Sequence, residues 1–258
     1  MWDIVKNTIT EFMRLKVIYI WIVIAIALIF SSYILDSLTI NQWNKVIVDF
    51  SLTVIEVFAL LLTLFLWAYL LYNEFSQKTV LFILSKIKHK YYFIIWKFLW
   101  FSIIIFFVYL ILSLWFLITL IFHHIPVELY YFEAIFLSYV KILVVLSFLI
   151  FFSTFVSPFL ALLSSFFIYL VSHSTAFMLF FTHIDKEHQV NSFIKGIINI
   201  IYYVLPNFQD LSMKEYFLSP YLGNYTNIHF MLSVLIWAWV YIFVLLFLAS
   251  FIFRKKEF

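Results

Sequence analysis

The stretch that decides the fold is FLWFSIIIFFVYLILSLWFLITLIF, residues Phe98–Phe122, which contains no charged side chain. A helix needs about 20 consecutive apolar residues to cross a hydrocarbon layer about 30 Å thick. These 25 residues meet that length in one piece. The stretch therefore predicts a helix whose natural surroundings are lipid.

The composition of the whole chain agrees with a lipid environment. Of the 258 residues, 66% are apolar and only 11% are charged, whereas a soluble domain carries about 25% charged residues. Cysteine is absent, which excludes disulfides and cysteine-based metal or redox chemistry. The two glycines, Gly196 and Gly223, lie outside the long apolar runs, so we expect continuous helices with bulky surfaces.

Further apolar runs on either side complete an all-α, polytopic membrane protein. One run, residues 131–181, would be about 76 Å long as a single helix, which no bilayer accommodates. We expect it to fold back at Ser157-Pro158, the clear helix breaker near its middle. The six predicted transmembrane helices are residues 17–35, 50–72, 98–122, 131–156, 159–181 and 230–253, in a single domain covering residues 1–258.

Lysine and arginine predict the orientation of these spans. Eleven of these residues fall in segments on the side of the N-terminus and four in segments on the other side, and basic residues favour the cytoplasmic side. Both termini are therefore expected in the cytoplasm. Before the first span, which we interpret as uncleaved, apolar residues from Trp2 to Phe12 recur at helical spacing and predict an N-terminal amphipathic helix at the membrane interface.

The segment between the second and third spans, NEFSQKTVLFILSKIKHKYYFIIWK at residues 73–97, has the pattern of a second amphipathic helix. Phe75, Val80, Leu84 and Ile87 would share one face. Such a helix on the cytoplasmic surface can insert an apolar ridge into a groove of a soluble partner while its charges set the orientation.

This segment resembles the corresponding part of ABC type-2 permeases. The family has a Glu, three residues, Gly-Thr, an apolar block ending in Ser-Arg-Pro, a further basic residue, and Gly-Lys at the start of the third span. In the same register without a gap, this chain has Glu74, Thr79, Ser85, Lys86, Lys90 and Lys97. It departs at Lys78, Ile87 and Trp96, where the family has Gly, Pro and Gly. The stretch LPNF at residues 205–208 also looks like one found before the last span of several members.

The resemblance implies the permease subunit of an ABC exporter in a bacterial cytoplasmic (inner) membrane. Two such subunits, identical or related, would pair in the bilayer, and a separate ATPase subunit would bind ATP and Mg²⁺. The residues implied to couple to this ATPase, within a coupling helix in segment 73–92, are Glu74, Thr79, Leu84, Ser85, Lys86 and Lys90. The chain contains no phosphate-binding GxxxxGK[ST] motif and no hydrolase motif, so a non-catalytic subunit is expected.

Glu56 and Lys141 are ionisable residues that lie well inside two different predicted spans. Such groups are rare at membrane depth, and they either pair in the bundle interior, line a substrate pathway, or extend to the interface. The main alternative to an ABC permease is a secondary transporter or channel that does not use ATP. The broken helices and repeats of many such proteins are largely missing here.

The outer segment, residues 182–229, has two features of interest. His183, Asp185 and His188 could hold a divalent metal, but their spacing matches no established motif, and a polar cluster at a membrane boundary is the ordinary explanation. Residues 191–204 predict an amphipathic helix on the outer leaflet. A periplasmic partner could dock on this segment, and no nucleic-acid partner is expected.

Overall fold

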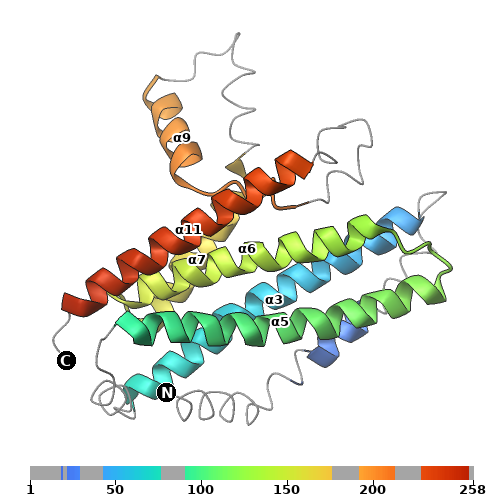
Figure 1. Ribbon diagram of the computed structural model, residues 1–258, viewed down its shortest axis with the longest axis horizontal. Helices are drawn as coiled ribbons and strands as arrows, with labels where there is room; N and C mark the ends of the chain where they lie inside the picture. Colours follow the sequence, from blue (N-terminus) through green and yellow to red (C-terminus); the bar gives the residue numbers. More distant parts are fainter. Residues whose placement is uncertain are drawn as a thin grey trace.

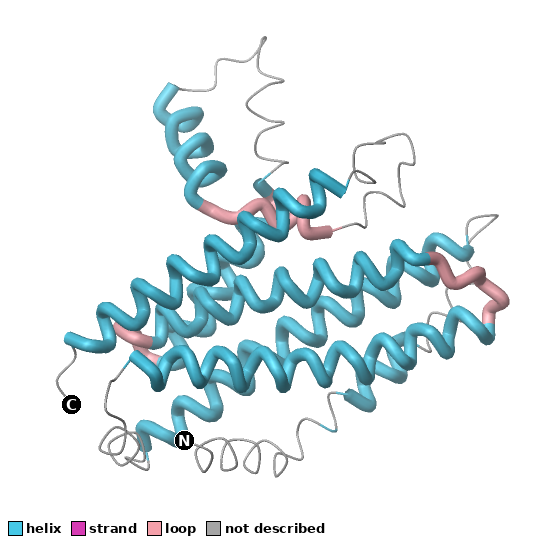
Figure 2. Tube along the Cα trace, viewed as in Figure 1, coloured by secondary structure: helices cyan, strands magenta, loops and turns pink. Residues whose placement is uncertain are grey.

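The computed structural model describes residues 19, 22–29, 43–76, 91–175, 192–212 and 228–255. Within these residues every regular element is a helix, as expected for an all-α protein (Figures 1 and 2). The labelled helices are α3 (Trp43–Ser76), α5 (Tyr91–Phe122), α6 (Leu129–Ser153), α7 (Pro158–His173), α9 (Ser192–Val204) and α11 (Ile228–Lys255).

The long helices form an antiparallel bundle (Figure 1). Helices α3, α6 and α11 run in one direction, and α5 and α7 run in the other. The carboxyl end of α3, the start of α5, the α6–α7 connection and the end of α11 therefore share one end of the bundle. The α5–α6 connection and the start of α11 lie at the opposite end. This alternation is the one that consecutive crossings of a bilayer require.

Helix α6 is the centre of the bundle. It contacts α3, α5, α7 and α11, and every residue from Val140 to Ile150 is buried. A helix that is apolar on all sides is stable only where neighbours or lipid surround it completely. Helix α6 therefore forms the core of the bundle, and the other helices pack around it.

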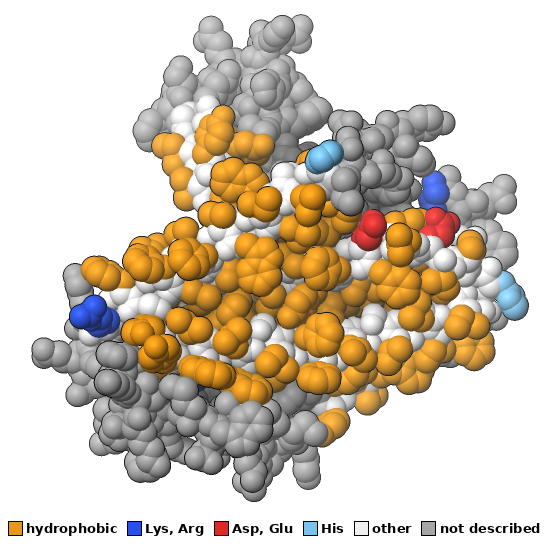
Figure 3. All heavy atoms as spheres, in the orientation of Figure 1, with side chains coloured by type: hydrophobic (Ala, Val, Ile, Leu, Met, Phe, Trp, Pro, Cys, Tyr) orange, Lys and Arg blue, Asp and Glu red, His pale blue; other side chains and the backbone are white. Residues whose placement is uncertain are grey.

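The face of the bundle seen in Figure 3 is largely apolar. Four helices are long and apolar enough to cross a membrane: residues Asn44–Trp67, Tyr91–Phe122, Leu129–Ser153 and His229–Arg254. Helix α11 is the least enclosed of them, and Phe243 and Phe247 are 72% and 63% exposed. Exposed aromatic side chains in such numbers indicate a surface covered by lipid. The chain is a membrane-embedded protein by this criterion.

The break predicted at Ser157-Pro158 is present. Helix α6 ends at Ser153, Ser157 is extended (ψ 155°), and Pro158 opens α7. The ring of a proline disfavours helical geometry in the residue before it, and its fixed φ suits the first turn of a helix. This pair of residues therefore divides the long apolar run into two antiparallel helices.

The helices that contain the predicted second and third spans are longer than those spans. Helix α3 has 34 residues and α5 has 32, against the predicted spans 50–72 and 98–122. Helix α5 includes Lys97, whose side chain is buried and lies beside two aromatic rings. The Lys97 Nζ lies 5.0 Å from the centre of the Phe93 ring and 5.7 Å from that of Trp67. The hydropathy of the sequence identifies the apolar part of each helix, whereas the helices themselves continue past that part.

The structure describes the predicted fifth span, residues 159–181, only in part. Helix α7 has 16 residues and ends at His173, and Ser174 and Thr175 are the last residues of this span that the structure describes. At about 1.5 Å per residue α7 is about 24 Å long, less than the thickness of the hydrocarbon layer. Of the predicted first span, the structure describes Tyr19 and the helical residues 22–29. The predicted count of six spans is thus represented by four long helices and one short one in the described part of the chain.

Candidate functional site: a buried ion pair

Helices α3 and α6 each place one ionisable side chain near the middle of their length, and the two meet. The Lys141 Nζ lies 2.8 Å from the Glu56 Oε1, and both side chains are buried, with exposures of 0% and 2%. Of the alternatives that the sequence leaves open, the structure contains the interior pair. Neither group extends to the membrane interface.

Two hydroxyl groups from other elements complete the site. The Tyr169 hydroxyl of α7 donates a hydrogen bond of 2.7 Å to the Glu56 Oε1. The Lys141 ammonium donates to the Ser212 Oγ, which lies in the segment after α9. Each charge is therefore hydrogen-bonded to a neutral partner as well as to the opposite charge, as a buried pair requires if it is not to destabilise the fold.

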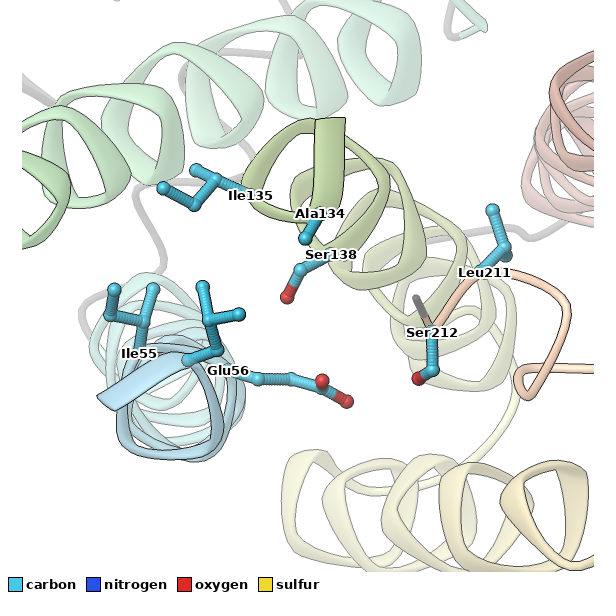
Figure 4. A pocket seen from close by; sticks show the side chains of 8 residues that line it. Ile55, Glu56, Ala134, Ile135, Ser138, Leu211 and Ser212 are labelled. Carbon is cyan, nitrogen blue, oxygen red and sulfur yellow. The ribbon is translucent and has the colours of Figure 1, made fainter. Parts of the chain in front are cut away.

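A second pair of hydroxyls lies beside this group. The Tyr109 hydroxyl of α5 and the Ser138 hydroxyl of α6 are 2.9 Å apart and buried. In Figure 4 the Glu56 side chain extends from α3 toward Ser138 and Ser212. Elements α3, α5, α6, α7 and the 205–212 segment thus all contribute a polar side chain to one region of the interior.

The segment 205–212 reaches this region because α7 is short. The backbone N–H of Phe208 donates to the carbonyl of Ser172, one of the last carbonyls of α7, at 3.1 Å. The Thr175 hydroxyl donates to the Asn207 Oδ1 at 3.0 Å. Carbonyls in the last turn of a helix have no partner within the helix. The carbonyl of Ser172 is met by the Phe208 N–H of the segment and also lies 3.1 Å from the Thr175 hydroxyl.

The same segment is anchored by its apolar side chains. Phe208 is fully buried, and its ring centre lies 5.9 Å from that of Tyr169. Leu211, next to Ser212, is also buried. Non-helical backbone at membrane depth is tolerated where protein surrounds it. We name this segment the plug (residues 205–212), because it packs into the interior beside the end of α7.

A small cavity adjoins the ion pair (Figure 4). Glu56, Ser138 and Ser212 line it together with apolar residues of α3, α6 and the plug. It leaves about 10 Å³ for the centre of a water-sized sphere, roughly the room that one water molecule needs. The cavity therefore has room for about one water molecule.

Sequence reasoning found Glu56 and Lys141 but missed Tyr169 and Ser212. An ionisable residue in an apolar run is a strong signal, whereas one tyrosine among many aromatics and one serine in a long connecting segment give none. The LPNF pattern at residues 205–208 was singled out for its resemblance, and it supplies the anchor of the plug.

Three serine hydroxyls in or directly after α7 bond back to the backbone of that helix. Ser164, Ser165 and Ser174 each donate to the carbonyl four residues earlier. These bonds account for the polar character of the helix without a substrate. The helix expected at residues 191–204 is present as α9.

Several predicted features lie outside the described residues. They are the N-terminal amphipathic helix, the proposed metal ligands His183, Asp185 and His188, and the coupling residues Thr79, Leu84, Ser85, Lys86 and Lys90. Position 74, occupied by Glu74, lies in the last turn of α3, so residues 73–76 of the predicted coupling segment belong to that helix. Within the described residues no group of three or more potential metal ligands occurs.

Comparisons of the chain with protein-family models, with curated proteins and with solved structures found no match.

Proposed function

We propose that the chain is the permease subunit of an ABC transporter, in which a separate ATPase subunit binds ATP and Mg²⁺ and acts on the segment that follows α3. One structural observation carries the proposal beyond the sequence resemblance. Helix α3 is continuous from Trp43 to Ser76 and so joins Glu56 of the buried pair to position 74, where the resembling segment begins. Eighteen residues of helix span about 27 Å.

A helix of this kind can transmit displacement because every turn is hydrogen-bonded to the next. Helix α5 would move with it, since Lys97 lies over Trp67, and the rings of Trp67 and Phe101 are in contact at 4.7 Å. Glu56 would then shift relative to Lys141, which is held on the central helix α6. A force applied at the end of α3 would thereby alter the ion pair, the cavity and the contact with the plug.

The test is a charge reversal in the segment that the ATPase would contact. The variant carrying Glu74→Lys and Lys86→Glu is purified from its native membrane in mild detergent, and co-purifying P-loop ATPase and its activity are measured in vesicles. The matched control reverses two exposed charges near the opposite end of the bundle, Lys45→Glu and Glu128→Lys. We expect stimulation of the ATPase by the chain to be lost in the first variant and kept in the control.

Unchanged stimulation in the first variant would contradict the coupling role. If no P-loop protein accompanies the intact chain, the ABC assignment itself is wrong.

A second candidate is a secondary transporter driven by a proton or ion, and the Glu56–Lys141 pair favours it. Buried ionisable pairs commonly mark proton and ion pathways, and this one has a cavity beside it. Flux in vesicles without ATP that disappears in the variant Glu56→Gln would establish this candidate. A requirement for ATP together with the ATPase subunit would exclude it.

A further inference from the structure

A groove separates the start of α5 from the end of α11. Tyr91 and Ile95 of α5 form one wall, Phe247 and Phe251 of α11 form the other, and the floor includes Ser250. Its volume is about 390 Å³, within the range of about 300–1,000 Å³ found for small-molecule sites. The groove is therefore large enough for a ligand, whereas the cavity beside the ion pair is not.

The lining of the groove is apolar along its length and charged at one end. Phe243, Phe247 and Phe251 follow one another at four-residue spacing, which places them in one row on α11. Arg254 continues this row and is the charged residue of the lining. The small side chain of Ser250 leaves room between the row and α5. A ligand that fits must be a long apolar chain with an anionic group at one end.

The charged end lies where the head groups of a bilayer would lie. Tyr91 is the first residue of α5, Arg254 is the last but one of α11, and both side chains are exposed. Tyrosine and arginine at helix ends prefer the membrane interface. Within the described part of the chain, Arg254 has no carboxylate within ion-pair distance, so its guanidinium is available to an anion.

The helices are held together beside the groove. The rings of Phe93 and Phe253 stack with their centres 5.7 Å apart, which joins α5 to α11 on the inner side. The groove therefore lies between two helices that are in contact with each other.

We propose that this groove binds an anionic phospholipid of the surrounding bilayer. The acyl chain lies along Ile95, Phe243 and Phe247, and the phosphate lies at the guanidinium of Arg254 with the Tyr91 hydroxyl beside it. Arginine suits this role because its planar donors pair with phosphate oxygens in two-point geometry. The positions of Lys and Arg predict that this end faces the cytoplasm, where basic sites between helices bind anionic lipids. The proposal rests on membrane embedding and is independent of the proposed transport function.

The test is lipid retention measured by native mass spectrometry. The full chain is reconstituted in vesicles of equal parts phosphatidylglycerol and phosphatidylcholine, extracted in mild detergent, and its bound lipid is identified. We expect phosphatidylglycerol to be retained in preference to phosphatidylcholine. Retention should fall about tenfold in Arg254→Gln, which removes a charge-assisted hydrogen bond, and should be unchanged in the control Lys45→Gln at the opposite end.

A second variant tests the groove itself. Ser250→Phe fills the floor and should reduce retention of both lipids while the helical content, measured by circular dichroism, stays that of the wild type. Equal retention of the two lipids, or undiminished retention in Arg254→Gln, would overturn the proposal.

A second copy of the chain could cover the same groove, and the absence of cysteine makes this outcome measurable. The variant Ser250→Cys would carry the chain's single thiol. Efficient disulfide cross-linking of two copies in the membrane would mean that protein occupies the groove, and it would also overturn the lipid proposal. Absence of cross-linking, with preferential phosphatidylglycerol retention, is the expected result.

Discussion

Removing one charge of the Glu56–Lys141 pair should destabilise the protein far more than removing both. Lys141→Met leaves the carboxylate of Glu56 buried without its counter-charge, and loss of one partner of a buried pair costs about 3–5 kcal/mol. At 2.8 Å the attraction between unit charges is about 6 kcal/mol at an effective dielectric constant of about 20. The cost of taking two ions out of water offsets much of it.

The double variant Glu56→Gln with Lys141→Met should recover most of the loss. Glutamine keeps an oxygen to accept the hydrogen bond of Tyr169, and methionine fills the space of the lysine side chain. Neutral replacement of a buried pair is often without net cost. We therefore expect the double variant to be at least about 2 kcal/mol more stable than the sum of the two single variants predicts.

The assay is unfolding in mixed micelles with increasing dodecyl sulfate, followed by the fluorescence of the nine tryptophans and by circular dichroism. Lys45→Met, which removes an exposed charge, should stay within about 0.5 kcal/mol of the wild type. The reasoning is refuted if each single variant unfolds like the wild type, or if the effects of the two substitutions simply add.

Two further substitutions test the remaining contacts of the site in the same assay. Tyr169→Phe removes the hydroxyl that donates to Glu56 and should lower the free energy of unfolding by about 1.5–3 kcal/mol, because the acceptor is charged. The control Tyr139→Phe removes a half-buried hydroxyl that donates to the carbonyl of Ser102 and should cost about 1 kcal/mol or less. Equal costs for the two variants would contradict the role assigned to Tyr169. Phe208→Ala removes a fully buried ring and should cost about 3–5 kcal/mol while increasing hydrogen exchange in residues 205–212, and unchanged exchange there would contradict its role as the anchor of the plug.

The sequence predicts the helical class and the order of the long helices because both follow from local composition. An uncharged run such as residues 98–122 has few alternatives to a helix in lipid. In the run of residues 131–181, the ring of Pro158 interrupts the helix by its own geometry. The exact ends are less predictable. Lys97, which directly precedes the uncharged run, lies inside α5 and close to the Trp67 ring, a contact between two helices that composition does not reveal.

The candidate site is predictable only in its charges. Glu56 and Lys141 are conspicuous because an apolar run makes any ionisable residue costly unless it is paired. The distance that joins them depends on how α3 packs on α6, and composition does not determine that packing. The contribution of Ser212 could not be predicted from the sequence. Its position depends on where α7 ends, and the sequence does not show that end because it stays apolar up to Phe181.

The end of α7 at His173 determines how the plug meets the site. The carbonyl of Ser172 has no donor within the helix, and it accepts from the Phe208 N–H of the plug as well as lying 3.1 Å from the Thr175 hydroxyl. Phe208 packs on Tyr169, whose hydroxyl donates to Glu56, and the turn that follows brings the Ser212 hydroxyl to the Lys141 ammonium. The plug therefore contacts both members of the charged pair, one through Tyr169 and the other directly, so a change in the position of Phe208 would alter the surroundings of both charges.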